Sequence, residues 1–223
     1  MDWRKRLTQR ESETHFVVEG RLAVKRLQAS NYEIEKVIQI GTDLTRDEAS
    51  QLLGFHFHRG QLATARKPPR PELSDFGPGT IVILPEIADP GNLGTIIRNT
   101  AALGGSGVIV GRGASPFNAK AVRASAGTLF QLPVRQSPDL QADLIALATT
   151  HTLIGASLSS PPLTLAQLPP LERPPALLLG SEDFGLTPAI EALCDHLCQL
   201  PMSRGVDSLN VASASAIFLN TLR

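Results

Sequence analysis

Cysteine is scarce in this chain, which has only Cys194 and Cys198 among its 223 residues. A Cys-x-x-x-Cys pair lacks the second pair of ligands that a structural zinc site needs. The two cysteines lie around a predicted helix-to-strand junction, so we expect them to be reduced, buried thiols. The sequence therefore predicts no metal centre.

Long apolar runs and an excess of charge are also missing. No run reaches the roughly 18 apolar residues of a membrane span. The charged residues 1–6 have no apolar stretch behind them that would make a signal peptide. We therefore expect a cytoplasmic protein with no membrane partner.

The charges balance, with 21 Lys and Arg against 21 Asp and Glu, which argues against a uniformly basic nucleic-acid binder. Residues 1–75 hold 13 basic against 11 acidic side chains, a slight bias that leaves room for a local basic patch. Glycine-rich phosphate loops are missing as well, because no Gly-x-Gly-x-x-Gly or Gly-Lys-Ser/Thr sequence follows a predicted strand. A nucleotide-dependent oxidoreductase on a doubly wound sheet is therefore disfavoured.

The first part of the chain has the pattern of a small α/β unit. Strands are predicted at residues 15–20 and 37–40, helices at 22–27 and 45–53, and a strand-like alternation at 54–60 that continues through 62–65. Prolines crowd residues 67–79, where regular structure cannot continue. We accordingly divide the chain into domains at 1–75 and 76–223.

Two histidines lie within the strand-like alternation. Period two places His56 and His58 on one face of that strand and Phe55 and Phe57 on the other. No cysteine or acidic third ligand lies near in the sequence, so we favour a polar, RNA-facing sheet surface over a metal pair.

Strands and helices alternate from residue 80 onward, in a chain that is 42% hydrophobic and only 4% aromatic. Short apolar runs lie at 81–84, 107–110, 132–134, 153–156, 176–179 and 197–200. Helical stretches lie at 92–104, 118–126, 139–149 and 187–194, and the proline-rich residues 161–175 resemble a surface connection. The predicted fold class is α/β, with a mostly parallel sheet covered by helices on both faces.

Ligands of such sheets bind beyond the carboxyl ends of the strands, and two of these ends carry glycines and polar residues. After the strand at 81–84, Asn92 begins a helix on which Arg98 flanks the buried stripe, between small neighbours that leave its guanidinium free to reach a cleft. Taken alone, that stretch is better explained by a solvated arginine. After the strand at 176–179, Gly180 permits close backbone approach, and Glu182 would be costly to bury without a partner.

The third strand end lies at residues 200–210. Pro201 ends the strand, Gly205 permits a backbone angle that other residues resist, and Ser208 or Asn210 can cap the helix that follows. The apolar stripe of that helix is expected to consist of Leu209, Ala212, Ala216 and Leu219. A capped terminal helix without further function explains this stretch equally well when it is taken alone.

Taken in order, the three stretches resemble the motifs of the SpoU/TrmH family of RNA 2′-O-ribose methyltransferases, within the SPOUT superfamily. The matching residues are Asn92, Gly94 and Arg98, then Gly180, Glu182, Gly185 and Leu186, then Leu200, Pro201, Met202, Leu209 and Asn210. Residues 89–94, 116–118 and 122–127 most resemble the branch that includes 23S ribosomal RNA enzymes.

The resemblance implies a fold that composition does not reveal, in which the C-terminal segment threads a deep trefoil knot, a rare feature among proteins. It implies S-adenosylmethionine bound in the knot by Gly180, Leu200, Met202 and Leu209, and a homodimer whose active site is completed across the interface. Residues 1–75 resemble, more loosely, an L30e-like RNA-binding domain that is shortened to fourteen residues between Ile40 and Phe55.

The resemblance also assigns catalysis to Arg98, with Asn92, Glu182, Ser208 and Asn210 arranging the arginine and the ribose. A guanidinium stays protonated in proteins, so orienting the hydroxyl and stabilising charge suits it better than accepting a proton. The implied substrate is ribosomal RNA, with transfer RNA as the other candidate. A catalytically silent RNA-binding relative is the competing interpretation; such a protein would show a broken motif, and all three motifs are intact.

Overall fold

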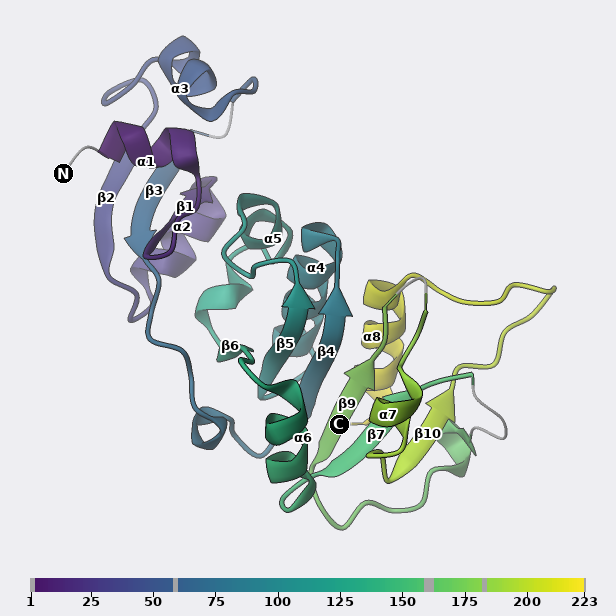
Figure 1. The fold of residues 1–223 in the computed structure, drawn as a ribbon. Helices are drawn as coiled ribbons and strands as arrows, with labels where there is room; N and C mark the ends of the chain where they lie inside the picture. The colour runs from purple at the N-terminus through teal and green to yellow at the C-terminus, as the bar shows by residue number, and fades with distance from the viewer. Residues whose placement is uncertain (1–2, 58–59, 159–162, 182–183, 223) are drawn as a thin grey trace.

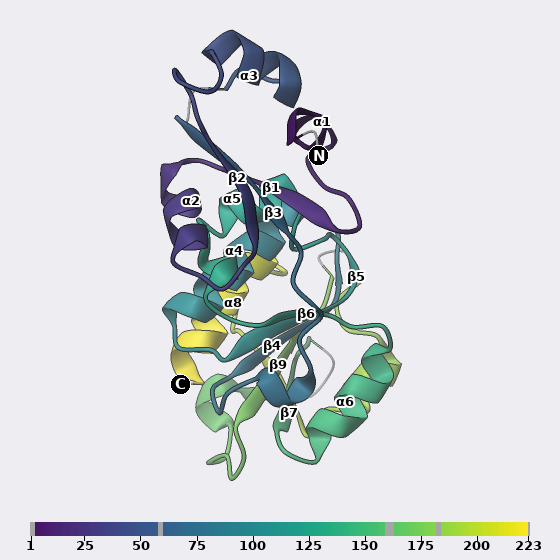
Figure 2. The ribbon, with the colours of Figure 1, turned by 90° about the vertical axis from the view of Figure 1, so that its left-hand side faces the viewer.

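The computed structural model describes residues 3–57, 60–158, 163–181 and 184–222, and the chain forms two separate β-sheets (Figure 1). A three-stranded sheet belongs to the N-terminal unit, and a seven-stranded sheet belongs to the remainder. Residues 67–72 between them form neither helix nor strand, as the proline content predicts. The N-terminal unit lies at one end of the molecule, next to α5 (Figure 2).

The N-terminal sheet is antiparallel, with the strands in the order β1-β3-β2. Its strands are β1 (His15–Glu19), β2 (Ile34–Gln39) and β3 (Gln61–Arg66). Its helices are α1 (Trp3–Gln9), α2 (Arg21–Gln28) and α3 (Arg46–Leu53). Side chains alternate along a strand, so Val17 packs beneath α1 and α3, while Phe16 and Val18 pack beside α2 on the other face.

The predicted strand over 54–60 is wrong for the residues of it that are described. Gly54 ends α3 in a left-handed conformation with φ +74°, and the amide of Phe57 donates to the Ser50 hydroxyl at 2.9 Å. This segment therefore folds back against α3 and buries Phe57, and β3 begins only at Gln61. His56 is exposed outside any strand and His58 lies outside the described residues, so the expected shared histidine face has no strand to support it.

The larger sheet is parallel throughout its pairings, in the order β6-β5-β4-β9-β7-β10-β8. Its strands are β4 (Ile81–Ile87), β5 (Gly107–Gly113), β6 (Val134–Gln136), β7 (Thr152–Ala156), β8 (Leu163–Thr164), β9 (Pro175–Leu179) and β10 (His196–Gln199). The predicted α/β class is confirmed. Strand β8 is missing from the prediction because two residues within a proline-rich stretch show no periodicity, and β10 ends one residue earlier than predicted, before Leu200.

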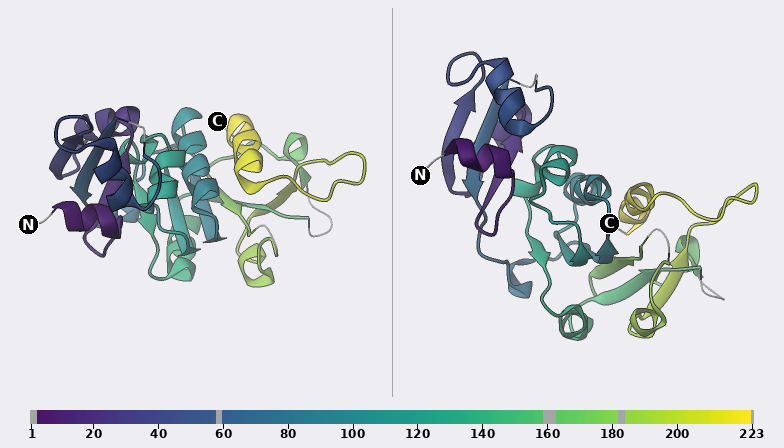
Figure 3. Two further views of the ribbon diagram at one scale, coloured as in Figure 1. Left: turned by 90° about the horizontal axis from the view of Figure 1, so that it is seen from above. Right: turned by 45° about the horizontal axis from the view of Figure 1, so that its top comes forward.

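Helices cover both faces of this sheet (Figure 3). On one face lie α4 (Pro90–Ala102), α5 (Ala119–Ala124) and α8 (Val211–Thr221), and on the other lie α6 (Leu140–Ala148) and α7 (Pro188–Glu191). Short 3₁₀ helices occur at η1 (Leu73–Asp75), η2 (Thr128–Phe130) and η3 (Leu165–Gln167). Strand β4 contributes side chains to the core on both faces of the sheet. Val82 and Leu84 pack toward α4, and Ile81 and Ile83 pack toward α6.

The two units share one apolar cluster. The ring of Phe16 in β1 lies 5.0 Å from that of Phe117 and 6.1 Å from that of Phe130, both beyond the linker. Beside them the buried carboxylate of Glu19 accepts hydrogen bonds from Arg10 and, at 3.2 Å, from Arg123. The N-terminal unit is therefore packed directly on α5. The domain division at residues 75 and 76 remains our proposal for where the chain passes from one unit to the other.

Among the described residues, no helix has the length and apolar character that crossing a membrane requires.

Candidate active site

A cavity of about 730 Å³ opens beyond the carboxyl ends of three neighbouring strands, β9, β7 and β10. These ends are level with one another, because Ala156 of β7 pairs with Leu179 of β9 and with Cys198 of β10. The cavity lies where ligands of parallel sheets bind. Six of the predicted site residues line it: Gly180, Leu200, Met202, Ser208, Leu209 and Asn210.

The wall that follows β9 is a tight turn. The amide of Gly185 donates to the Ser181 carbonyl at 3.0 Å, and the amide of Ser181 donates to the Gly185 carbonyl at 3.2 Å. A Cβ atom on Gly180 would lie 2.1 Å from the carbonyl carbon of Gly185 and 2.4 Å from the amide of Leu186. Only glycine therefore fits at position 180. The predicted site residue Glu182 lies outside the described residues.

The opposite wall is formed by residues 200–210 and the start of α8. Asn210 caps this helix, accepting hydrogen bonds from the amides of Ala212 at 3.0 Å and Ser213 at 3.4 Å. The sequence predicted either Ser208 or Asn210 as the cap of this helix. The cap is Asn210, because α8 begins at Val211. Leu209 is 41% exposed just before the helix, so its predicted place in the buried stripe is wrong. The buried side chains of α8 are Val211, Ala212, Ser215, Phe218 and Leu219.

The side chain of Asn210 also reaches the first predicted motif, because its amide Nδ2 donates to Oδ1 of Asn92 at 3.1 Å. Asn92 is the third residue of α4, whose cap is Asp89, with Asp89 Oδ1 accepting from the Asn92 amide at 2.8 Å. The side-chain hydrogen bond from Lys120, followed by the backbone bond from Asn92, lowers the pKa of the Asp89 carboxyl. This cap therefore stays ionised and fixes the start of α4.

Asn99 is a site-supporting residue that the sequence interpretation missed. Its Nδ2 donates to the Ala212 carbonyl at 2.8 Å and to the Ser215 hydroxyl at 3.0 Å, so it ties α4 to α8. Asn99 lies seven residues, about two turns, after Asn92 and therefore on the same face of the helix. A polar residue recurring on that face was the available signal.

Arg98 lies outside the cavity of its own chain. Its side chain is exposed on α4, and it makes no hydrogen bond or ion pair with any residue that the structure describes. Within one chain it lines neither of the two cavities described here, and its catalytic role stays a prediction. The structure brings together the second and third motifs and Asn92, and it leaves Arg98 on the surface.

A serine and a glutamate complete the wall between β7 and α7, and neither was predicted. Ser157 follows the last residue of β7, and its hydroxyl donates to Oε1 of Glu191 at the end of α7. The strand-end rule could have indicated Ser157, whereas Glu191 reaches the cavity only through the packing of α7.

Both cysteines are free thiols, as predicted, with Cys198 buried in the cavity wall and Cys194 partly buried. Burial, followed by the charges of Glu191 and Asp195, raises the pKa of Cys194 to about 12. Burial also raises the pKa of Cys198. Within the described residues, no group of three His, Cys, Asp or Glu side chains is placed to hold a metal ion.

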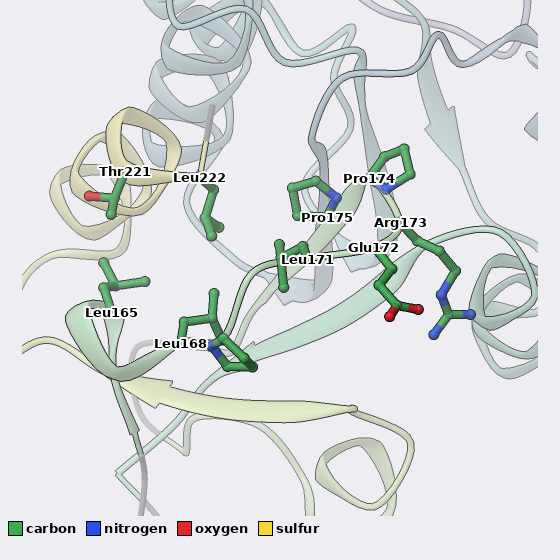
Figure 4. Close-up of a pocket in the computed structure, with 10 residues that line it drawn as sticks. Leu165, Leu168, Leu171, Glu172, Arg173, Pro174, Pro175, Thr221 and Leu222 are labelled. Carbon is green, nitrogen blue, oxygen red and sulfur yellow. The ribbon is translucent and has the colours of Figure 1, made fainter.

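A second cavity of about 480 Å³ lies near the amino end of β9, between the proline-rich segment and the end of α8 (Figure 4). Its walls include Leu165, Leu168, Leu171 and Leu222, with Glu172 and Arg173 at one side. It contains none of the predicted site residues, so we place the candidate active site at the first cavity.

Known proteins resemble both the sequence and the fold. Residues 79–220 match the SpoU rRNA Methylase family. A relative from Mycobacterium bovis, named an uncharacterized tRNA/rRNA methyltransferase, is 34% identical over 227 residues, which cover 90% of this chain and 78% of that protein. A 23S rRNA (uridine(2479)-2′-O)-methyltransferase from Streptomyces viridochromogenes is 35% identical over 145 residues, 62% of this chain and 50% of that one.

Among solved structures, the AdoMet-bound rRNA methyltransferase from Sinorhizobium meliloti superposes with a TM-score of 0.86 at 25% identity, over 99% of this chain and 92% of that one. This likeness covers the N-terminal unit as well as the larger sheet. Together with the match over residues 79–220, it shows that the chain belongs to the SpoU rRNA Methylase family.

Proposed function

We propose that this protein is an S-adenosylmethionine-dependent methyltransferase that methylates a ribose 2′-hydroxyl of RNA in the cytoplasm. Ribosomal RNA is the substrate we expect, with transfer RNA as the other candidate. The observation that carries the proposal is the cavity at the ends of β9, β7 and β10, lined by residues of two motifs and joined to the first motif by the Asn210–Asn92 hydrogen bond. The names of the relatives support RNA as the substrate.

The cavity suits the proposed cofactor in its chemistry. Leu179, Leu186 and Phe218 offer apolar surface to an adenine ring, and the hydroxyls of Ser157 and Ser208 offer polar contacts. The missing side chain at Gly180 exposes backbone at the end of β9. We assign cofactor binding to Gly180, Leu200, Met202 and Leu209, chiefly through their backbone groups. When bound, S-adenosylmethionine supplies an activated methyl group on a sulfonium sulfur.

The remaining predicted residues would act on the ribose. A 2′-hydroxyl is a poor nucleophile, so it must be held in line with the methyl group and assisted in losing its proton. We assign to Arg98 the orientation of the hydroxyl and the stabilisation of the developing negative charge, because a guanidinium donates hydrogen bonds and cannot accept a proton. Asn92, Glu182, Ser208 and Asn210 arrange the arginine and the ribose.

The exposed position of Arg98 supports a homodimer with shared active sites. Arg98 lies outside the cavity of its own chain, so a second copy would have to bring its arginine to that cavity. Four exposed apolar side chains, Leu158, Phe184, Val206 and Leu209, belong to the cavity wall or to residues 200–210 beside it. Exposed apolar groups gathered at one site are typical of a surface that a partner covers.

Mixing two impaired variants tests the shared site. At a concentration of S-adenosylmethionine well below the raised Kd of Gly180→Ala, we expect this variant and Arg98→Ala each to have little activity alone. Mixed in equal amounts, they should recover about a quarter of wild-type methyl transfer, since half of the dimers would then hold one intact site out of two. Light scattering on the same samples checks for dimers. No recovery after confirmed subunit exchange, or a monomer that methylates RNA, would contradict the shared site.

Two parts of the fold belong to the same proposal. We infer that the C-terminal segment forms a trefoil knot, which is supported by a chain that passes from α7 on one face of the sheet, through β10, to α8 on the other. We infer that residues 1–75 form an L30e-like domain that docks RNA, a role supported by their strand-and-helix composition and their packing on α5.

The proposal is tested with the full-length chain. Calorimetry should show saturable binding of S-adenosylmethionine that S-adenosylhomocysteine competes away, and tritiated methyl groups should be incorporated into ribosomal RNA at ribose 2′-oxygens. Methylation mapped in cells with and without the protein would identify the nucleotide. RNA binding without methyl transfer would instead identify a catalytically silent relative, and methyl groups found only on bases would contradict the ribose assignment.

A further inference from the structure

Within one chain, and among the described residues, the wall of the cavity that we assign to the cofactor has acidic side chains and no basic ones. Among the described residues that line it, only Glu191 and Asp207 carry a charge. Their carboxylates give the cavity a negative potential, which water and salt screen only in part where a carboxylate is half-buried, as Glu191 is. The wall is therefore matched to a ligand with net positive charge.

Glu191 is the better placed of the two carboxylates. It is half-buried at the end of α7, and the Ser157 hydroxyl holds it against the end of β7. Asp207 lies on the exposed loop, where water and salt screen its charge. The pKa of the neighbouring Cys194, raised to about 12 by burial and then by Glu191 and Asp195, keeps that thiol neutral, so it adds no negative charge to that of Glu191.

We propose that Glu191 makes this cavity prefer the cationic cofactor to its neutral product, and so promotes product release. This inference rests on the proposed function. In the reaction the carbon–sulfur bond breaks with its electron pair left on sulfur, a carbon–oxygen bond forms to the ribose, and the hydroxyl proton passes to water. S-adenosylmethionine, with one net positive charge, thereby becomes S-adenosylhomocysteine, with none, and its attraction to Glu191 is lost.

Calorimetry on the full-length chain tests this with three ligands: S-adenosylmethionine, neutral S-adenosylhomocysteine, and sinefungin, whose amine carries positive charge in place of the sulfonium. Glu191→Gln is expected to raise Kd for the two cationic ligands about three- to tenfold, a Coulomb effect at partly screened distance, and Kd for S-adenosylhomocysteine by less than about twofold. Glu191→Asp retains the charge and should retain the preference. Asp207→Asn should have a smaller effect.

Glu172→Gln is the matched control. It makes the same chemical change at the second cavity, where Glu172 is exposed (Figure 4), and should leave all three dissociation constants unchanged. Higher ionic strength should reduce the preference in the unmodified chain and have little effect on the Glu191→Gln variant.

The outcomes separate this inference from the proposed function. If Glu191→Gln raises Kd for all three ligands by the same factor, the carboxylate accepts a hydrogen bond from a group that the ligands share, and the inference is wrong. An unchanged ratio of dissociation constants would also overturn it while leaving the proposed function intact. If the unmodified chain binds none of the three ligands, both the proposed function and this inference are wrong.

Discussion

Replacing Arg98 by alanine is expected to lower methyl transfer to RNA by at least about a hundredfold, the usual scale for a group that assists proton transfer or stabilises charge in a transition state. The affinity for S-adenosylmethionine should change little, because we assign Arg98 to the ribose hydroxyl and not to the cofactor. Tritiated-methyl incorporation into ribosomal RNA, measured beside a calorimetric titration of the same variant, separates the two effects.

Two further variants sharpen this prediction. Arg98→Lys should not restore full activity, because an ammonium group cannot reproduce the planar fork with which a guanidinium contacts a phosphate and a hydroxyl together. Arg112→Ala removes an exposed arginine at the end of β5, which lines neither cavity, and should leave the rate unchanged. If Arg98→Ala methylated RNA at the wild-type rate, the residue would be a solvated side chain on a capped helix, and its catalytic assignment would be wrong.

Replacing Gly180 by alanine is expected to raise Kd for S-adenosylmethionine by about ten- to a hundredfold, because inserting a methyl group where there is no room costs about 1–3 kcal/mol. The new Cβ would lie 2.1 Å from the Gly185 carbonyl carbon and 2.4 Å from its oxygen, and both atoms belong to the backbone. No side-chain rotation can relieve these contacts, so the turn between β9 and α7 must move out of the cavity wall. Calorimetry measures the effect.

Gly185→Ala is the matched control for this substitution. Gly185 adopts φ +66°, and no atom lies within 4 Å of the position its Cβ would take, so the cost there is backbone strain of about 1–2 kcal/mol without overlap. Thermal unfolding should show that strain in Gly185→Ala, while its cofactor affinity falls less than that of Gly180→Ala. Equal losses of affinity in the two variants would mean that the close approach at Gly180 is not what shapes the wall.

Local patterns in the sequence determined much of the fold. Alternation of apolar runs and amphipathic stretches after residue 80 predicted the parallel sheet with helices on both faces, since burial on two sides leaves a continuous apolar run. The helix predicted over 45–53 is also confirmed, as α3 with Thr45 as its cap. The sequence marked Gly180 as a site of close backbone approach, and the structure shows that the approaching backbone is that of Gly185 and Leu186. Failures occurred where a local pattern was too short, as in β8, or where a glycine turn redirected the chain, as at Gly54.

The arrangement of the site was decided only by the tertiary structure. The order of the strands places the ends of β9, β7 and β10 side by side, although β7 and β10 are separated by about forty residues in the chain. The hydrogen bonds from Asn210 to Asn92 and from Asn99 to Ala212, like the contact between Ser157 and Glu191, join residues that no periodicity relates. The periodicity of apolar residues indicates which side of a helix or strand is buried. Packing between residues far apart in the chain determines which buried sides meet. This packing forms the cavity and leaves Arg98 outside it.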